Sequence, residues 1–315
     1  MSSTIPAFAK KGDLLLVDEA CNEPIKMGLN LSRSTIQYFK HNDMADLEAI
    51  LQSIADDDVH YKRDATQQRR FIVVEGIYRN TGDICFLPNI LALKERFRYR
   101  VILDESLSFG TMGATGRGIT EHFGVKVTDV EILVVAMDTA LGSVGGLCVG
   151  TREVVDHQRL SGAGYCFSAS APPFLSAAAI ESLSQLARNP EILTTLAKNS
   201  QALHKGLSAV KGMRLLSDVV TPVMHLVLDP PLASRELEIA ALSLIANNCV
   251  HRGVGVTTSK ASLTESSIDP VLRPSIRICA SSDLTPKEII HAVAEIKKEV
   301  TAALTKPRRT TRQSM

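Results

Sequence analysis

Two segments of the chain carry side chains that could serve a bound ligand. The apolar run Val101–Leu103 ends at Asp104, and the apolar run Ile132–Ala136 leads to the small-residue turn Leu141–Gly146. A carboxylate at a strand end can pair with a protonated ring nitrogen, and a glycine-rich turn lets the backbone approach a phosphate. Thr139 stands shortly before the turn, and its hydroxyl cannot form an imine with a carbonyl compound. The amine for such a covalent bond must therefore come from another residue, or the covalent bond is absent.

This layout is typical of enzymes that hold pyridoxal phosphate (PLP) on a large α/β domain. In such enzymes the strand-end aspartate pairs with the pyridinium nitrogen, and a lysine before the turn forms the Schiff base. The pattern predicts cofactor contacts for Asp104 and for Ser143 in the turn, with Thr139 in place of the lysine. The alternatives are that Asp104 bonds to nearby backbone and that Ser143 belongs to an ordinary turn.

The composition is that of a soluble globular protein with a sizeable core. The chain has 315 residues, of which 45% are apolar and 22% charged, and this length predicts two domains. The net charge of +1 gives no reason to expect nucleic acid or another polyanion as the main partner. The six cysteines form no CxxC pair, which indicates a reducing compartment, and no apolar run reaches the ~18 residues of a membrane span.

The pattern of apolar residues changes at about residue 173. Up to that point, short apolar runs alternate with helical stretches, which predicts an α/β fold with a mostly parallel sheet and flanking helices. The predicted strands are Leu14–Val17, Phe71–Val74, Val101–Leu103 and Ile132–Ala136, and the predicted helices are Asp43–Ala55 and Leu87–Phe97. The charged stretch Asp56–Arg70 is predicted to be a solvated loop rather than a metal site.

Longer helices beyond residue 173 predict a smaller α+β domain. The predicted helices are Phe174–Ala187, Pro190–Val210 and Pro286–Leu304, and the predicted strands are Val223–Leu228 and Ser275–Ala280. We therefore expect a large domain over residues 1–173, a small domain with linking helices over residues 174–305, and a basic disordered tail over residues 306–315.

Five ordered motifs resemble those of the α-oxoamine synthases, PLP enzymes of fold type I that condense an amino acid with an acyl-CoA. The longest is Asp104–Gly118 (DESLSFGTMGATGRG) followed by Thr120–Gly124 (TEHFG), which is similar to the family's DEAHSFGxxGxxGRGxxEHFG. The other four are His41–Met44 (HNDM), Val74–Asp83 (VEGIYRNTGD), Leu141–Gly146 (LGSVGG) and Phe167–Pro173 (FSASAPP). The resemblance implies a fold-type-I large domain, incomplete at its N-terminus, and a smaller C-terminal domain.

The resemblance also implies roles for three residues outside the two opening segments. In the family, the segment that matches FSASAPP reaches the PLP phosphate of the neighbouring subunit, which implies this role for Ser168 and Ser170. Arg277, in the segment SIRICAS, corresponds to the family arginine that binds the amino-acid carboxylate. The alternatives are that the serines only shape their loop and that Arg277 belongs to a structural ion pair.

The departures from the family pattern point to one of its groups. Thr139 replaces the Schiff-base lysine, and Leu107 and Asn22 replace two family histidines at the cofactor ring. These departures resemble those of the lysine-less subunits of eukaryotic serine palmitoyltransferases. The resemblance implies a heterodimer whose lysine-bearing partner makes most PLP contacts, and which forms 3-ketosphinganine from L-serine and palmitoyl-CoA. It also implies the cytosolic face of the endoplasmic reticulum membrane, or the cytosol for a chain this short.

Two other functions stay open at this point. An autonomous PLP-dependent acyltransferase would need another lysine, yet Lys198 is the only lysine between Lys126 and Gln201. A regulatory or binding remnant would take part in no acyltransferase complex. Co-purification with a lysine-bearing homologue would exclude the remnant, and cofactor absorbance of the lone chain would identify an autonomous enzyme.

Overall fold

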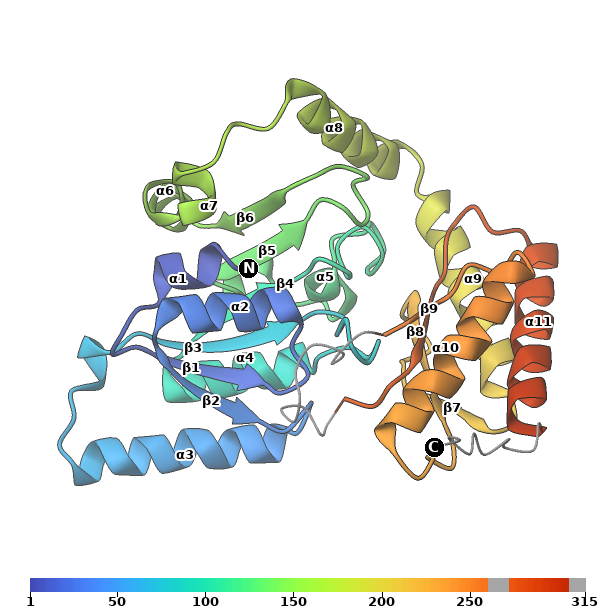
Figure 1. Cartoon of the computed structure of the whole chain (residues 1–315). Helices are drawn as coiled ribbons and strands as arrows, with labels where there is room; N and C mark the ends of the chain where they lie inside the picture. The colour runs from blue at the N-terminus through green and yellow to red at the C-terminus, as the bar shows by residue number, and fades with distance from the viewer. Residues whose placement is uncertain (260–271, 306–315) are drawn as a thin grey trace, which may run out of the picture. The chain divides into compact units, whose positions relative to one another are not determined.

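The computed structural model describes residues 1–259 and 272–305 (Figure 1). The chain divides into two compact units, Met1–Thr194 and Thr195–Met315. The predicted basic tail over residues 306–315 lies outside the described residues. The division into functional domains at residue 173 stays a prediction.

The first unit is built on a six-stranded sheet whose strands follow the order β2-β1-β3-β4-β5-β6 (Figure 1). Its strands are β1 (Leu14–Asp18), β2 (Thr35–Phe39), β3 (Arg70–Glu75), β4 (Arg100–Asp104), β5 (Ile132–Ala136) and β6 (Gly146–Gly150). The first five strands run parallel, and β6 pairs antiparallel with β5. All four predicted strands of this part are present, so the predicted α/β fold with a mostly parallel sheet is confirmed.

Helices pack around this sheet, and its central strands are apolar because they are covered. Every residue of β1 is buried, as are five of the six residues of β3. Helix α1 packs on α2 and α6, while α3 packs on α4 and β2. The helices of this unit are α1 (Thr4–Phe8), α2 (Glu23–Ser32), α3 (Met44–His60), α4 (Leu87–Phe97), α5 (Ile119–His122), α6 (Arg152–Ser161), α7 (Ala163–Cys166) and α8 (Pro173–Arg188), with 3-10 turns at Ala65–Gln67 and Val127–Asp129.

The prediction that Asp56–Arg70 forms a solvated loop is wrong at both ends of the segment. Helix α3 continues to His60, and β3 begins at Arg70. Arg70 donates to both carboxylate oxygens of Asp58, at 2.6 and 2.9 Å. This fork-shaped ion pair ties the end of the helix to the start of the strand, so part of the charge in the segment serves local structure.

The second unit contains a four-stranded antiparallel sheet in the order β7-β8-β10-β9. Its elements are α9 (Glu191–Ser208), whose first residues belong to the first unit, β7 (Met213–Leu215), β8 (Val223–Leu228), α10 (Arg235–His251), β9 (Thr257–Thr258), β10 (Ile276–Cys279) and α11 (Pro286–Thr305). Apolar side chains of the three helices and of the sheet form one core, so the predicted α+β character is confirmed. Of the helices in the described ranges, none combines the length and apolar character needed to cross a membrane.

Candidate functional site

Three acidic side chains lie at the carboxyl edge of the six-stranded sheet. Asp18, Glu75 and Asp104 end the neighbouring strands β1, β3 and β4, and each is at most 4% exposed. The carboxyl ends of parallel strands meet at one edge, where α/β proteins bind their ligands. Because a buried carboxylate is costly unless it is paired or hydrogen-bonded, the partners of these three groups decide what this edge can do.

Asp104 and Thr139, which the sequence places at one site, are joined through a third residue. Asp104 Oδ1 accepts from the backbone N–H of Ser106 at 2.9 Å, and the Thr139 hydroxyl donates to the carbonyl of Ser106 at 2.6 Å. The Ser106 hydroxyl accepts from the backbone N–H of Ala136 at 2.9 Å. Ser106 thus links the ends of β4 and β5. Ser106 was not predicted as a site residue, although it follows Asp104 by two positions in the DES motif.

Asn22 binds the other oxygen of Asp104. Its Nδ2 donates to Asp104 Oδ2 at 3.2 Å and to Glu75 Oε2 at 2.8 Å, while its Oδ1 caps α2 by accepting from the N–H of Ile25. Burial and then the Asp104 carboxylate raise the pKa of Glu75 to about 8, although N–H donors on Glu75 act to lower it. The sequence had pointed to Asn22 only as the replacement of a family histidine.

A second hydrogen-bond network, centred on His41, surrounds Asp18, the third acidic residue at this edge. His41 Nδ1 lies 2.8 Å from Asp18 Oδ1, and its Nε2 lies 2.9 Å from Asp83 Oδ2. The Tyr78 hydroxyl donates to Asp18 at 2.9 Å. Burial acts to lower the pKa of His41, but the hydrogen bonds to Asp18 and Asp83 outweigh it and raise this pKa to about 10. His41 is therefore a cation at neutral pH. The sequence signals for this network were the HNDM motif, which contains His41, and the VEGIYRNTGD motif, which contains Tyr78 and Asp83.

The three serines predicted to bind the cofactor lie in two different settings. Ser143 is buried and donates to the carbonyl of Leu175, 2.7 Å away at the start of α8. Ser168 is exposed and donates to the carbonyl of Gly164. Ser170 is exposed in the segment that joins α7 to α8. The structure thus places one serine in a turn inside the first unit and the other two on its surface.

Arg277 lies in the second unit, on β10, opposite His225 of β8 and Thr257 of β9. Its Nε atom is buried and has no hydrogen-bond partner among the residues that the structure describes. A buried donor without an acceptor is costly, so this guanidinium is suited to an acceptor from a ligand or another chain. The carboxylate-binding role of Arg277 stays a prediction.

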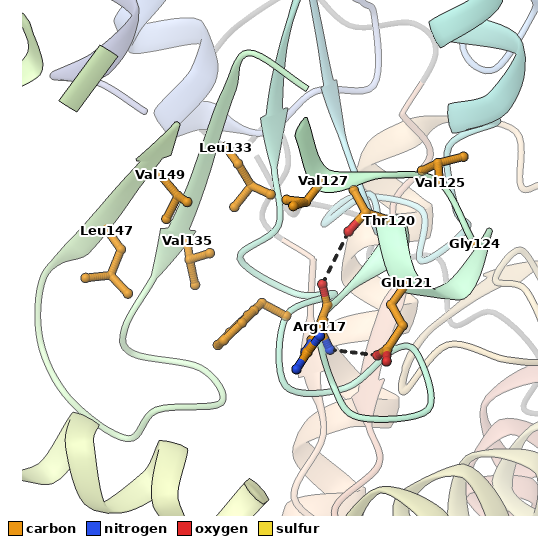
Figure 2. A pocket seen from close by; sticks show the side chains of 11 residues that line it. Arg117, Thr120, Glu121, Gly124, Val125, Val127, Leu133, Val135, Leu147 and Val149 are labelled. Atoms are coloured by element: carbon orange, nitrogen blue, oxygen red, sulfur yellow. Dashed lines mark hydrogen bonds between the residues drawn. The ribbon is translucent and has the colours of Figure 1, made fainter. Parts of the chain in front are cut away.

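A groove of about 500 Å³ opens on the first unit at the strands β5 and β6 (Figure 2). Two cross-strand pairs, Leu133 with Val149 and Val135 with Leu147, form its apolar wall. The other side chains at the groove are Phe109, Arg117, Thr120, Glu121, Val125 and Val127, together with Gly124. The predicted site residues are not among the residues that line the groove, and no sequence motif predicted it.

The residues of this chain alone do not fit bound PLP. Thr139 stands where the Schiff-base lysine is expected, and its hydroxyl is bonded to Ser106. Both oxygens of Asp104 already accept hydrogen bonds. The hydroxyls of Ser143 and Ser168 donate to carbonyl groups of this chain. The lysine needed for a Schiff base is therefore lacking at this position, and Asp104, Ser143 and Ser168 are already hydrogen-bonded within this chain.

The purified chain should show no internal-aldimine absorption after incubation with PLP, because Thr139 offers no amine. Borohydride reduction followed by peptide mapping should find no lysine that carries PLP in stoichiometric yield. A lysine-bearing PLP enzyme treated in the same way is the positive control. Recovery of one defined PLP-lysine peptide from this chain would instead identify an autonomous enzyme.

Comparisons with known proteins identify the family. The family model described as aminotransferase class I and II matches residues 1–296. Long chain base biosynthesis protein 1c of Oryza sativa subsp. japonica is 42% identical over 297 residues, which cover 94% of this chain and 60% of that protein. Serine palmitoyltransferase 1 of Dictyostelium discoideum is 39% identical over 306 residues, which cover 95% of this chain and 62% of that protein. The chain thus spans about three-fifths of the length of these relatives.

A solved structure has the same fold. The serine palmitoyltransferase of Sphingomonas wittichii superimposes on the chain with a TM-score of 0.82 at 25% identity, and the match covers 97% of this chain and 71% of that one. The chain therefore belongs to the aminotransferase class I and II family, a family of PLP-dependent proteins of fold type I, and is a homologue of subunit 1 of serine palmitoyltransferase.

Proposed function

We propose that this chain is the lysine-less subunit of a serine palmitoyltransferase heterodimer. The observation that carries the proposal is Thr139, at the place where the motifs lead us to expect the Schiff-base lysine, in a chain that matches relatives named serine palmitoyltransferase 1. In this proposal a lysine-bearing partner subunit makes most of the PLP contacts. The heterodimer condenses L-serine with palmitoyl-CoA to 3-ketosphinganine, the first step of sphingolipid synthesis, and this chain stabilises the partner and completes the shared cleft.

An exposed apolar surface supports the proposal of a partner. It is formed by large apolar side chains of α6, α7 and α8 that are 64–90% exposed, and we call it the α6–α8 surface: Leu160, Tyr165, Phe167, Phe174 and Ile180. Helices α6 and α7 bury none of their residues. Several large apolar side chains exposed to water on neighbouring segments of a chain are typical of a contact with another protein or with a membrane. We assign this surface to the partner subunit because Ser168 and Ser170 lie on the same segment.

In the heterodimer this chain would contribute polar groups rather than the covalent residue. Ser170 would donate to the phosphate of PLP held by the partner, and so would Ser168 once its hydroxyl leaves the carbonyl of Gly164, since hydroxyls suit phosphate oxygens without adding charge. The buried Nε of Arg277, which has no partner within residues 1–259 and 272–305, would donate to the carboxylate of L-serine. For Asp104 and Ser143, whose hydrogen bonds lie inside this chain, cofactor contact stays a prediction.

We further propose a location for the heterodimer and a domain assignment for this chain. The heterodimer would lie at the cytosolic face of the endoplasmic reticulum membrane, held there by its partners. Residues 1–173 would form this chain's part of the PLP-transferase large domain, and residues 174–305 would form the small domain. The resemblance of the chain to its serine palmitoyltransferase relatives supports both assignments.

Co-expression with a lysine-bearing serine palmitoyltransferase subunit should raise the soluble yield of this chain, because the partner would cover the α6–α8 surface. Affinity purification through a tag on this chain should recover the partner. The purified complex should form 3-ketosphinganine from L-serine and palmitoyl-CoA, which is measured with labelled serine.

The partner subunit expressed alone is the control for this experiment. Equal activity of the partner with and without this chain would make the chain a binding or regulatory remnant. A cooperatively melting monomer that does not recover the partner would contradict the proposed function.

A further inference from the structure

Asn22 joins two buried carboxyl groups that end neighbouring strands. Glu75 and Asp104 are partners in the register of β3 and β4, so their side chains leave the sheet side by side. The backbone N–H of Asn22 donates to Glu75 Oε1 at 2.7 Å, and its Nδ2 donates to Glu75 Oε2 at 2.8 Å and to Asp104 Oδ2 at 3.2 Å. All three residues are at most 4% exposed. One amide group thus bridges both acids away from water.

Two neighbouring carboxylates in such a place cannot both ionise without a large cost. Loss of hydration and the repulsion between two like charges each favour a shared proton. Three N–H groups, two from Asn22 and one from Arg79, act in the opposite direction on Glu75. Burial and the Asp104 charge outweigh these donors and raise the pKa of Glu75 to about 8. At neutral pH the Glu75 carboxyl is therefore mostly protonated.

Other ionisable groups face the pair from the elements around it. Cys21 and Lys26 lie at the start of α2, and burial, Glu75 and further carboxylates raise the pKa of the Cys21 thiol well above its usual value. Asp18, at the end of β1, adds a further negative charge near Cys21. The surroundings therefore include charges of both signs.

We propose that Asn22 bridges Glu75 and Asp104 into a buried acid pair that holds this edge of the sheet together and occupies the carboxylate expected to pair with a cofactor ring nitrogen. The pair is a structural device of this chain, and it does not depend on the proposed partner or activity. Thr139 cannot form the covalent link to a cofactor, and the Asn22 bridge binds the Asp104 carboxylate that would form the ionic contact with the cofactor ring.

The pair makes the stability of the fold depend on pH in a defined direction. The pKa of Glu75 in the folded chain lies above its usual value of 4.5, so the contribution is fully present below pH 4.5 and is lost as the pH rises toward 8. One proton bound by the folded chain and released on unfolding changes the unfolding constant by up to about tenfold per pH unit. Urea unfolding between pH 5 and pH 8 should therefore show falling stability in the wild type.

Glu75→Gln should remove the contribution of Glu75 to the slope of stability against pH, whatever the substitution does to the stability at any single pH. Glu23→Gln is the matched control, because Glu23 is next to Asn22 in sequence but exposed, and it should leave the wild-type slope unchanged. The protonated-carboxyl band in infrared spectra of the folded chain at pH 6 should also weaken in Glu75→Gln. An unchanged pH slope together with an unchanged infrared band would overturn the proposal.

Asn22→Ser separates the bridge from the helix cap. Serine keeps an oxygen that can accept from the N–H of Ile25, the cap that Asn22 now provides, but it lacks the amide that donates to both acids. The unfolding constant should rise by about tenfold at pH 5, for the lost hydrogen bonds. The rise should be larger at pH 8, because the amide stabilises the ionised pair. A loss of equal size at every pH would reduce Asn22 to a packing residue and overturn the proposal.

Discussion

Replacing His41 by leucine should lower the free energy of unfolding by about 3–5 kcal/mol. The substitution leaves the Asp18 side chain, which has no exposed surface, without its cationic partner, and it removes an ion pair from Asp83. A buried carboxylate that loses its counter-charge costs far more than a broken surface ion pair. Urea unfolding of wild type and variant near pH 6, followed by circular dichroism, measures the difference.

The His41 prediction has a matched control and a pH dependence of its own. His157→Leu removes a histidine whose Nε2 lies 2.7 Å from the carbonyl oxygen of Ala7, and it should cost about 1 kcal/mol. Because the folded pKa of His41 is raised above 6.5, the stabilisation is fully present below pH 6.5 and is lost as the pH rises toward 10. The gap between wild type and His41→Leu should narrow over that range. Equal losses for the two histidine variants would mean that the ionic network contributes little.

Central strands of this fold could be predicted from the sequence, whereas the edge strands could not. The runs that form β1, β3, β4 and β5 are apolar because both faces of the sheet are covered. In β2 (TIQYF) Phe39 alone is buried, and in β6 (GLCVG) no residue is buried. Edge strands need no continuous apolar run, so the pattern that identifies the centre of the sheet is absent from them.

In the candidate site, residues in or next to sequence motifs could be predicted, whereas the contacts between distant residues could not. Asp104 could be found because it begins an ordered motif, and Thr139 because it stands two positions before the LGSVGG motif. The bridge from Asn22 to Asp104 spans 82 positions, and the one from Asn22 to Glu75 spans 53. No local pattern in the sequence encodes a hydrogen bond over such separations. Asn22 could be noticed only as a missing histidine, and its role as a donor to two acids needed the fold.

Replacing Phe167 by aspartate should weaken binding to the lysine-bearing partner by roughly a hundredfold, or about 3 kcal/mol. Phe167 is 90% exposed in this chain, so the proposed interface gives its ring its main burial. Truncation of an aromatic side chain at the centre of an interface removes the apolar contact, and the new carboxylate would also have to lose its hydration on binding. Titration of labelled partner subunit with each form of the chain gives the dissociation constants.

Val59→Asp is the matched control for this experiment. Val59 is 81% exposed and lies on α3 instead of the α6–α8 surface. Neither substitution removes a side chain from the core, so both variants should melt like the wild type. Loss of binding in Phe167→Asp alone would support the α6–α8 surface as the partner contact and would bring Ser168 and Ser170 to that interface. If Phe167→Asp binds as tightly as Val59→Asp, the partner lies elsewhere, and the proposed contact of these serines with the partner's cofactor is lost with it.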